Sequence, residues 1–279
     1  MYKFFSDLSF ELSAIITKKY STSFSSAVAL LEKEKREAIY GIYAFVRFAD
    51  EIVDTFHQSD KEYLLNKFEE DLNYALSEQI SMNTVLYAFA LTVKKYRIPD
   101  HLIRSFLDSM KLDLYKSEYL SEHEIKAYIY GSADVVGLMC LCVFLDGNKS
   151  IYDKLKMNAM ALGAAFQKVN FLRDLKNDIH ELNRTYFPNV NKNNFDEKAK
   201  QSIIENIEND FTTALIGIKQ LPGRSKSAVL IAYFYYSSLL KKLKNTPANK
   251  ILETRIRINN FIKSILFLKS YFYFLLKLI

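Results

Sequence analysis

The sequence contains little glycine and proline, with 7 and 4 residues among 279, far below the usual shares of about 7% and 5%. A sheet protein of this length needs many turns, and turns consume these two residue types. All-β and doubly wound α/β architectures are therefore disfavoured. Apolar residues make up 49% of the chain and charged residues 25%, as in ordinary globular proteins. We predict an all-α fold with a single domain over residues 1–279, because no linker divides the chain.

Cysteine is equally scarce, and no signal sequence is recognisable. Cys140 and Cys142 lie in one apolar run, with no second pair to complete a zinc site, which predicts buried free thiols in a reducing compartment. The N-terminus lacks a signal-like apolar core, so we expect a cytoplasmic protein. The net charge of +6 permits an anionic partner. The lysines are scattered among glutamates and form no basic stripe, so we expect no nucleic acid.

Chain-breaking residues are so rare that the helices between them are long. Ser121 and Glu124 resemble a capping box at the start of one of these helices. The polar, proline-bearing stretch 183–194 is the clearest loop. Apolar periodicity and breakers predict helices over 32–55, 63–76, 99–115, 121–144 and 152–181, and two more punctuated by the turns at 222–223 and 245–249.

The last segment, 259–279, is strongly apolar but contains Lys263, Lys269 and Lys277. A membrane-spanning helix needs about 20 mostly uncharged residues, so this segment is not one. Two interpretations stay open. It is either a terminal core helix or a basic, aromatic-rich helix lying on a membrane surface, which would give a cytoplasmic protein a peripheral membrane contact.

Two acidic ladders stand far apart in the chain. Asp50 and Asp54 form the first, and Asn170, Asp174 and Asp178 form the second. Residues four apart share one helix face, with Cβ atoms about 5–6 Å apart. Two like charges at 4 Å repel each other by about 4 kcal/mol at an effective dielectric constant of 20. Such ladders are usually solvated faces, so an apolar setting for them needs an explanation.

Both ladders have strongly apolar neighbours and an arginine each, Arg47 and Arg173. A hard cation accounts for this pattern, since Mg²⁺ prefers oxygen ligands and is typically held by one or two carboxylates plus substrate phosphates. Two facing ladders with arginines would bind Mg²⁺-bound diphosphates and stabilise a departing diphosphate. A di-iron site would need Glu-x-x-His pairs, and no histidine here has a glutamate three positions earlier.

Four segments stand in order along the chain: Tyr20-Ser-Thr-Ser-Phe24, the Arg47-to-Asp54 motif after Tyr43, Tyr128-Ile-Tyr-Gly with Val136-Gly137, and the Asn170-to-Asp178 motif followed by Arg184-Thr-Tyr-Phe-Pro188. Through these segments the chain resembles the squalene/phytoene synthases, the head-to-head trans-prenyltransferases, over about residues 20–243. It is most similar to bacterial phytoene synthases of carotenoid pathways. Lys176-Asn177 departs from the Gly-Glu of many relatives, and one extra residue lies between Asp178 and Arg184.

The resemblance implies a helical bundle of the prenyl-synthase type around a central apolar cavity, with both aspartate motifs at its mouth. It implies Mg²⁺, or Mn²⁺ in its place, as the cofactor. The implied metal ligands are Asp50, Glu51, Asp54, Asn170, Asp174 and Asp178. The implied substrate-binding residues are Ser21, Ser23, Tyr43, Arg47, Gln167, Asn170, Arg173, Arg184 and Tyr236, with Gly137 at a further pocket position. The implied catalytic residues are Asp50, Asp54, Asp174, Asp178, Tyr128 and Arg47.

The activity that the resemblance implies is Mg²⁺-dependent condensation of two geranylgeranyl diphosphates to phytoene, with release of diphosphate, in carotenoid biosynthesis. The aromatic content, 21 Phe and 19 Tyr, suits an intermediate carbocation, because an aromatic face stabilises a cation by about 0.5–2 kcal/mol. The same reaction on two farnesyl diphosphates, giving squalene or dehydrosqualene, stays open because no residue reveals the pocket depth. A non-catalytic assembly factor of the family is disfavoured, since both ladders are intact.

Overall fold

The structure is a computed structural model that describes residues 2–180, 184–188, 190 and 194–259. Within these residues the chain forms twelve α-helices and one π-helical segment, with no strand beyond an isolated bridge between Glu118 and Thr185. The predicted all-α fold is confirmed. The elements are α1 (Tyr2–Tyr20), α2 (Thr22–Val28), α3 (Lys33–Asp54), α4 (Lys61–Glu78), α5 (Thr84–Tyr96), α6 (Asp100–Leu112), α7 (Glu122–Ile129), η1 (Tyr130–Asp134), α8 (Val135–Phe144), α9 (Lys149–His180), α10 (Glu197–Ile218), α11 (Gly223–Lys244) and α12 (Ala248–Glu253).

Most predicted helices are present with ends shifted by only a few residues. Helices α3, α4, α6 and α9 match the predictions for 32–55, 63–76, 99–115 and 152–181. The described part of the predicted loop 183–194 is free of helix. Residues 260–279 lie outside the described part, so the terminal helix, its membrane contact and the extent of the single domain stay predictions.

Side-chain caps explain where several helices begin. Ser121 Oγ accepts a hydrogen bond from the backbone N of Glu124 at 3.2 Å, as the capping-box pattern predicts. The Glu124 carboxylate in turn accepts from the backbone N of Leu120 at 2.8 Å, one residue before the expected donor. Asp60 and Asp196 cap α4 and α10 in the same manner.

The prediction of one uninterrupted helix over 121–144 is wrong, because the π-helical segment η1 divides it into α7 and α8. Two glycines bring η1 close to its neighbours. A Cβ on Gly131 would lie 2.7 Å from the carbonyl oxygen of Ser105 on α6, and a Cβ on Gly163 of α9 would lie 2.8 Å from that of Ala133. A π-turn inserts one extra residue into the helix and changes which side chains face a given neighbour.

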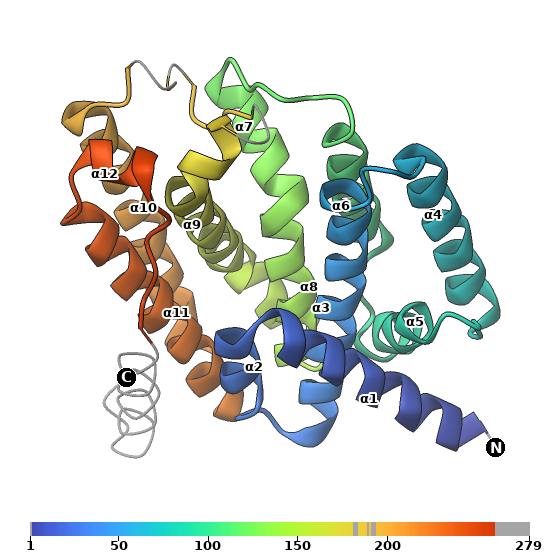
Figure 1. Cartoon of the computed structure of the whole chain (residues 1–279). Helices are drawn as coiled ribbons and strands as arrows, with labels where there is room; N and C mark the ends of the chain where they lie inside the picture. Colours follow the sequence, from blue (N-terminus) through green and yellow to red (C-terminus); the bar gives the residue numbers. More distant parts are fainter. Residues whose placement is uncertain (1, 181–183, 189, 191–193, 260–279) are drawn as a thin grey trace.

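The Glu122–Phe144 run is long and apolar enough to cross a membrane by composition alone, but 56% of its most apolar window is buried inside the protein. It therefore serves as a core element here. Figure 1 shows α9, α10 and α11 on one side of the molecule and α3, α5 and α6 on the other, with α7, η1 and α8 between them. Helix α1 crosses the base and packs against α3 and α5.

The apolar core has separate clusters on the two sides. One joins α3, α5, α6 and α8, and its centre is Phe45, which is fully buried and stacks on Phe89 with ring centroids 4.0 Å apart. The other joins α9, α10 and α11 with α7. The two clusters hold their helices on either side of a central cavity.

We expect Gly131→Ala to lower the free energy of unfolding by about 1–3 kcal/mol, because the added methyl group meets the Ser105 carbonyl and the Ser109 hydroxyl. The same substitution in an unobstructed helix would instead stabilise by up to about 1 kcal/mol. Urea unfolding followed by circular dichroism measures the difference. A variant as stable as the wild type would contradict the close packing of η1 on α6.

Candidate active site

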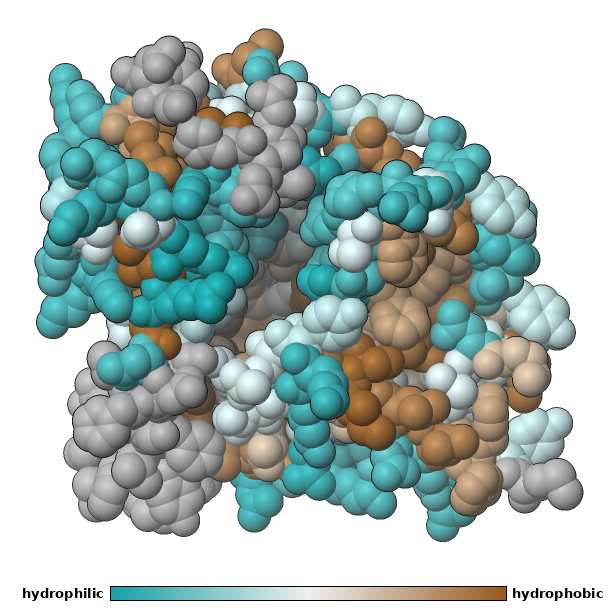
Figure 2. Space-filling view, in the orientation of Figure 1, coloured by the Kyte–Doolittle hydropathy of each residue, from teal (hydrophilic) through white to brown (hydrophobic). Residues whose placement is uncertain are grey.

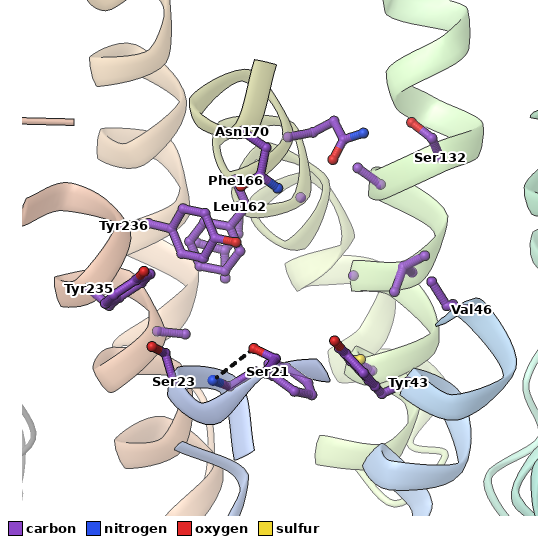
Figure 3. Close-up of a pocket in the computed structure, with 18 of the residues that line it drawn as sticks. Ser21, Ser23, Tyr43, Val46, Ser132, Leu162, Phe166, Asn170, Tyr235 and Tyr236 are labelled. Carbon is purple, nitrogen blue, oxygen red and sulfur yellow. Dashed lines mark hydrogen bonds between the residues drawn. The ribbon is translucent and has the colours of Figure 1, made fainter. Parts of the chain in front are cut away.

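A cavity of about 1260 Å³ lies between the two sides of the molecule. Figure 2 shows the surface hollowed at its centre, and Figure 3 shows side chains from α2, α3, η1, α9 and α11 around the open space. Part of the lining is apolar and part carries carboxylates, arginines and hydroxyls. Its apolar residues include Val28, Leu31, Ile39, Leu141, Phe144, Leu155 and Leu221.

The two acidic ladders line this one cavity from opposite helices. Asp50 and Asp54 project from α3, and Asp174 and Asp178 project from α9. Arg184 connects the ladders, since its Nη1 lies 3.3 Å from Asp54 Oδ1 and its backbone N donates to the Asp178 carbonyl at 2.7 Å. The structure thus brings both ladders to one cavity, as the resemblance implies.

Burial and like charges perturb the ladder carboxylates. Burial raises the pKa of Asp50 to about 7, and the neighbouring charge of Asp54 adds to the rise while Arg47 opposes it. Burial also raises the pKa of Asp178 to about 7, with Asp174 as the next largest cause and Asp54 contributing from the facing helix. The carboxylates thus repel one another across the cavity, as well as along each helix.

Asp174 is held by two arginines. Arg173 donates to both of its carboxylate oxygens, with Nε 3.0 Å from Oδ1. Arg255 Nε also lies 2.6 Å from Asp174 Oδ1, and the chain around it, 255–258, lines the cavity. The sequence did not single out Arg255, because it follows the last motif and reaches the site only through tertiary folding.

Arg47 lines the cavity, pairs with Glu51 one turn later and lies over the Tyr20 ring, with its Cζ 4.4 Å from the ring centroid. Glu51 itself is not among the cavity-lining residues. Glu51 is three residues from Asp54, a spacing found on one helix face, yet its carboxylate meets Arg47. The structure does not bring this predicted metal ligand to the other five, and its carboxylate orients Arg47 instead.

Tyr128 is buried, and its hydroxyl donates to Asp113 Oδ2 at 2.9 Å. Asp113, a residue that sequence reasoning missed, also lines the cavity, and its backbone carbonyl accepts from Arg184 Nη2 at 2.9 Å. Tyr128 packs in an aromatic group with Tyr119 and Tyr186, its ring centroid 4.8 and 5.6 Å from theirs. The Asp113–Tyr128 pair joins the end of α6 to the end of α7 beside the ladders.

The remaining predicted substrate-binding residues all line the cavity: Ser21, Ser23, Tyr43, Gln167, Asn170, Tyr236 and, at the further position, Gly137. Ser21 Oγ accepts from the backbone N of Phe24 at 3.3 Å and so caps α2. Tyr236 stacks on Phe166 with ring centroids 4.0 Å apart, and Figure 3 shows this pair beside Asn170. A Cβ on Gly137 would lie 2.9 Å from the Ala159 carbonyl, which explains a glycine between α8 and α9.

The donor atoms suit a hard dication. The ladders offer carboxylate oxygens together with Asn170 Oδ1, which is buried and has no hydrogen-bond partner among the described residues. Within the described part of the chain, no three acidic, histidine or cysteine side chains lie close enough together to hold an ion by themselves. This fits Mg²⁺, which usually takes one or two carboxylates and completes its coordination with water and substrate phosphates.

Fold and site together define a class: an all-helical protein whose apolar cavity carries facing acidic ladders and arginines. The family model for squalene/phytoene synthase matches residues 17–261. The chain belongs to the squalene/phytoene synthase family, as its motifs predicted.

Among curated relatives, the chloroplastic phytoene synthase of Daucus carota is 32% identical over 178 residues, which cover 62% of this chain and 44% of that protein. The 4,4'-diapophytoene synthase of Staphylococcus haemolyticus (strain JCSC1435) is 30% identical over 200 residues, covering 70% of this chain and 66% of that protein. The chain thus spans about half to two thirds of these relatives.

Solved structures share the fold. A dehydrosqualene synthase in complex with a ligand superposes with a TM-score of 0.80 at 20% identity, covering 96% of this chain and 97% of that one. The squalene synthase HpnC from Alicyclobacillus acidocaldarius gives a TM-score of 0.75 at 19% identity, covering 85% and 93%. The helical bundle of the prenyl-synthase type is therefore confirmed.

We expect Asp113→Asn to flatten the pH dependence of stability. Burial raises the pKa of Asp113 to about 7, opposed by Arg184 and by the Tyr128 hydrogen bond, with Asp54 adding to the rise. The unfolded carboxyl has a pKa of about 4, so the folded state binds more protons between these values and stability falls as pH rises through them. The asparagine variant lacks this contribution.

The measurement is the Tm of metal-free protein at about pH 5 and about pH 8, on either side of the titration. The wild-type Tm should fall more between the two than that of the variant. Asp108→Asn, which changes an exposed carboxylate on the same helix, is the matched control and should behave as the wild type. Equal slopes for wild type and Asp113→Asn would contradict the buried titration.

Proposed function

We propose that this protein is a prenyltransferase that condenses two geranylgeranyl diphosphates head to head, giving phytoene and free diphosphate in carotenoid biosynthesis. The observation that carries the proposal is the Arg184 link, which joins Asp54 of α3 to the backbone of Asp178 on α9 inside an apolar cavity. Carboxylates facing each other in this setting suit a metal-bound diphosphate. The cavity of about 1260 Å³ offers room for prenyl chains behind it.

The residues divide into three roles. Asp50, Asp54, Asn170, Asp174 and Asp178 would hold Mg²⁺ or Mn²⁺, and Glu51 would act only through Arg47. Bound Mg²⁺ supplies charge neutralisation for the diphosphate oxygens. Arg47, Arg173 and Arg184 donate hydrogen bonds to the same oxygens, and Arg255 adds a fourth positive charge beside Asp174.

The reaction needs an allylic carbon–oxygen bond to break, with the electron pair leaving on the diphosphate. The resulting carbocation is then attacked by the double bond of the second substrate, and loss of a proton gives a cyclopropyl intermediate. The aromatic faces of Tyr43 and Tyr236 stabilise nearby cationic charge by about 0.5–2 kcal/mol per contact. The Tyr128–Asp113 hydrogen bond holds the phenol in place next to the ladders. The apolar lining keeps water from the cation.

Substrate length is the finer part of the proposal. Phytoene synthases and a diapophytoene synthase stand among the relatives at 30–32% identity, so farnesyl diphosphate, giving squalene or dehydrosqualene, is the second candidate. The greater number of phytoene synthases among the most similar relatives supports geranylgeranyl diphosphate. A non-catalytic assembly role is not supported, since both ladders line the cavity.

A product assay tests the proposal. The purified full chain is incubated with Mg²⁺, NADPH as a hydride donor and either geranylgeranyl or farnesyl diphosphate, and the hydrocarbon is identified by mass spectrometry. The hydride donor is included because squalene carries two more hydrogen atoms than the condensation alone supplies. We expect phytoene from the first substrate. A thirty-carbon product from farnesyl diphosphate alone would replace the phytoene assignment by the second candidate, and no hydrocarbon from either would overturn the reaction class.

Asp54→Asn and Asp174→Asn should each lower turnover at least about 100-fold, the equivalent of about 2.7 kcal/mol, because each removes one carboxylate charge from the metal site. Both variants should stay folded, since the two side chains line the cavity and do not belong to the apolar core. The Mg²⁺-induced rise in Tm should shrink in both, which reports on the metal independently of turnover.

Asp71→Asn is the matched control, because Asp71 is a partly exposed carboxylate on α4 that pairs with Lys67 and is not among the cavity-lining residues. It should keep wild-type turnover and the wild-type response to Mg²⁺. Wild-type rates for Asp54→Asn at limiting Mg²⁺ would show that the α3 ladder does not serve the metal.

A further inference from the structure

The most deeply buried side chains of helix α1 carry hydroxyl groups, whereas an ordinary surface helix buries apolar side chains. Its fully buried residues are Ser9, Ser13 and Thr17, each 0% exposed. Each hydroxyl donates to the carbonyl oxygen four residues earlier, at 2.7, 2.9 and 2.9 Å, so burial leaves none of these groups unpaired. These short side chains allow α1 to lie close against α3 and α5. Apolar residues pack beside them, since Phe5 contacts the Tyr87 ring and Ala14 and Ile16 pack against the core.

A second set of apolar side chains on α1 lies away from the fully buried hydroxyl residues. Phe4 is 75% exposed and Ile15 is 48% exposed, while Leu8 and Leu12 are half-buried. Positions 4, 8, 12 and 15 follow the spacing of four and three that defines one helix face. Figure 2 shows hydrophobic surface gathered over α1, on the same side of the molecule as the central hollow. Burying such a face is favourable, so its exposure points to a partner.

The two ends of α1 carry basic and aromatic residues that are exposed to solvent. Tyr2 and Lys3 begin the helix, and Lys18, Lys19 and Tyr20 end it. Tyrosines and lysines at both ends of an apolar helix face are typical of helices that lie in a membrane interface, where the ring meets the headgroups and the ammonium meets anionic lipids. The helix has three lysines against the two acidic residues Asp7 and Glu11, and the chain carries a net charge of +6.

We propose that the α1 face, defined by Phe4, Leu8, Leu12 and Ile15 with the flanking Lys18 and Lys19, docks this protein onto a lipid bilayer that contains anionic lipids. This surface is distinct from the apolar segment 259–279, for which a membrane contact was predicted from sequence.

The position of α1 relative to the cavity favours a bilayer over a protein partner. Helix α1 passes into α2 through Ser21, and the junction from Tyr20 to Phe24 lines the cavity. A bilayer against the α1 face would therefore lie next to a segment that lines the cavity. This step rests on the proposed function, because a long-chain prenyl diphosphate and a hydrocarbon product both partition into lipid.

A second copy of the chain is the other occupant to consider. A stable dimer interface buries about 800 Å² on each partner, more than four side chains supply when two of them are half-buried. The lysines beside the face suit anionic lipid headgroups. The chemistry of the face therefore agrees better with lipid than with a copy of itself.

Vesicle co-sedimentation of the full chain tests the proposal. The probes are vesicles of phosphatidylcholine alone and of phosphatidylcholine mixed with phosphatidylglycerol. We expect wild-type protein to bind the anionic vesicles, and Phe4→Ser with Ile15→Ser to lower the partition coefficient at least about tenfold, since a tenfold change corresponds to only about 1.4 kcal/mol. Lys18→Gln with Lys19→Gln should weaken binding to the anionic vesicles only.

Tyr74→Ser with Met82→Ser is the matched control, because it removes two exposed apolar side chains, 59% and 91% exposed, from α4 and the segment after it. It should leave vesicle binding unchanged. Residues 260–279 are present in every variant, so any binding through them stays constant. Thermal unfolding verifies that each variant folds, and none of the measurements requires turnover.

Two outcomes would overturn the proposal. The first is that α1 plays no part in vesicle binding, either because the wild-type protein binds neither kind of vesicle or because the α1 variants bind as strongly as the wild type. The second is a wild-type dimer in light scattering that Phe4→Ser with Ile15→Ser converts to a monomer while vesicle binding persists, which would assign the α1 face to a second copy. Failure of the product assay would leave the vesicle result standing, so the two proposals are separable.

Discussion

Electrostatic repulsion among carboxylates inside an apolar cavity is the constraint on which the rest of this structure depends. Asp50 and Asp54 on α3 face Asp174 and Asp178 on α9, and burial with mutual repulsion raises the pKa of Asp50 and Asp178 to about 7. Arg184 and its neighbouring arginines offset only part of this charge. Such an arrangement gains most from a dication, which removes the repulsion and brings a diphosphate with it.

The packing of the two halves keeps these charges at a fixed separation. The stacked rings of Phe45 and Phe89 hold α3 against α5, while the second cluster holds α9 against α10 and α11. Between them, η1 is pressed against α6 and α9 at Gly131 and Gly163, where a side chain of any size would meet backbone atoms. Glycine at these two positions lets η1 lie close to α6 and α9, and the two clusters hold α3 and α9, which carry the acidic residues, on either side of the cavity.

The sequence predicted the ladders because their geometry is local. A spacing of four places Asp50 with Asp54, and Asp174 with Asp178, on one face whatever the tertiary structure. The same rule does not separate Glu51 from them, because Glu51 and Asp54 are three apart and can share a face. In the structure the Glu51 carboxylate meets Arg47, a contact that spacing does not decide.

Long-range features were beyond sequence reasoning for a physical reason. Arg255 and Asp113 reach the cavity through the packing of whole helices, and no local spacing encodes that contact. The π-turn at η1 arises from a close approach between helices that only the folded structure reveals. Arg184 was predicted through the family resemblance, which places an arginine after the second ladder, although its contact with Asp54 spans 130 residues.

Helix α1 departs from the usual rule that a helix buries its apolar side chains. Hydrophobic periodicity would bury Phe4, Leu8, Leu12 and Ile15, yet the fold buries the hydroxyl face and leaves Phe4 largely in solvent. The exposed apolar face of α1 and the buried, mutually repelling carboxyl groups of the ladders both lower the free energy of unfolding, and the contacts among the described residues offset only part of each loss. A ligand that binds only the folded state repays such costs by mass action. Binding is therefore expected where local structure is costly in stability. In this protein the costly positions are the acidic ladders within the cavity and the exposed apolar face of α1.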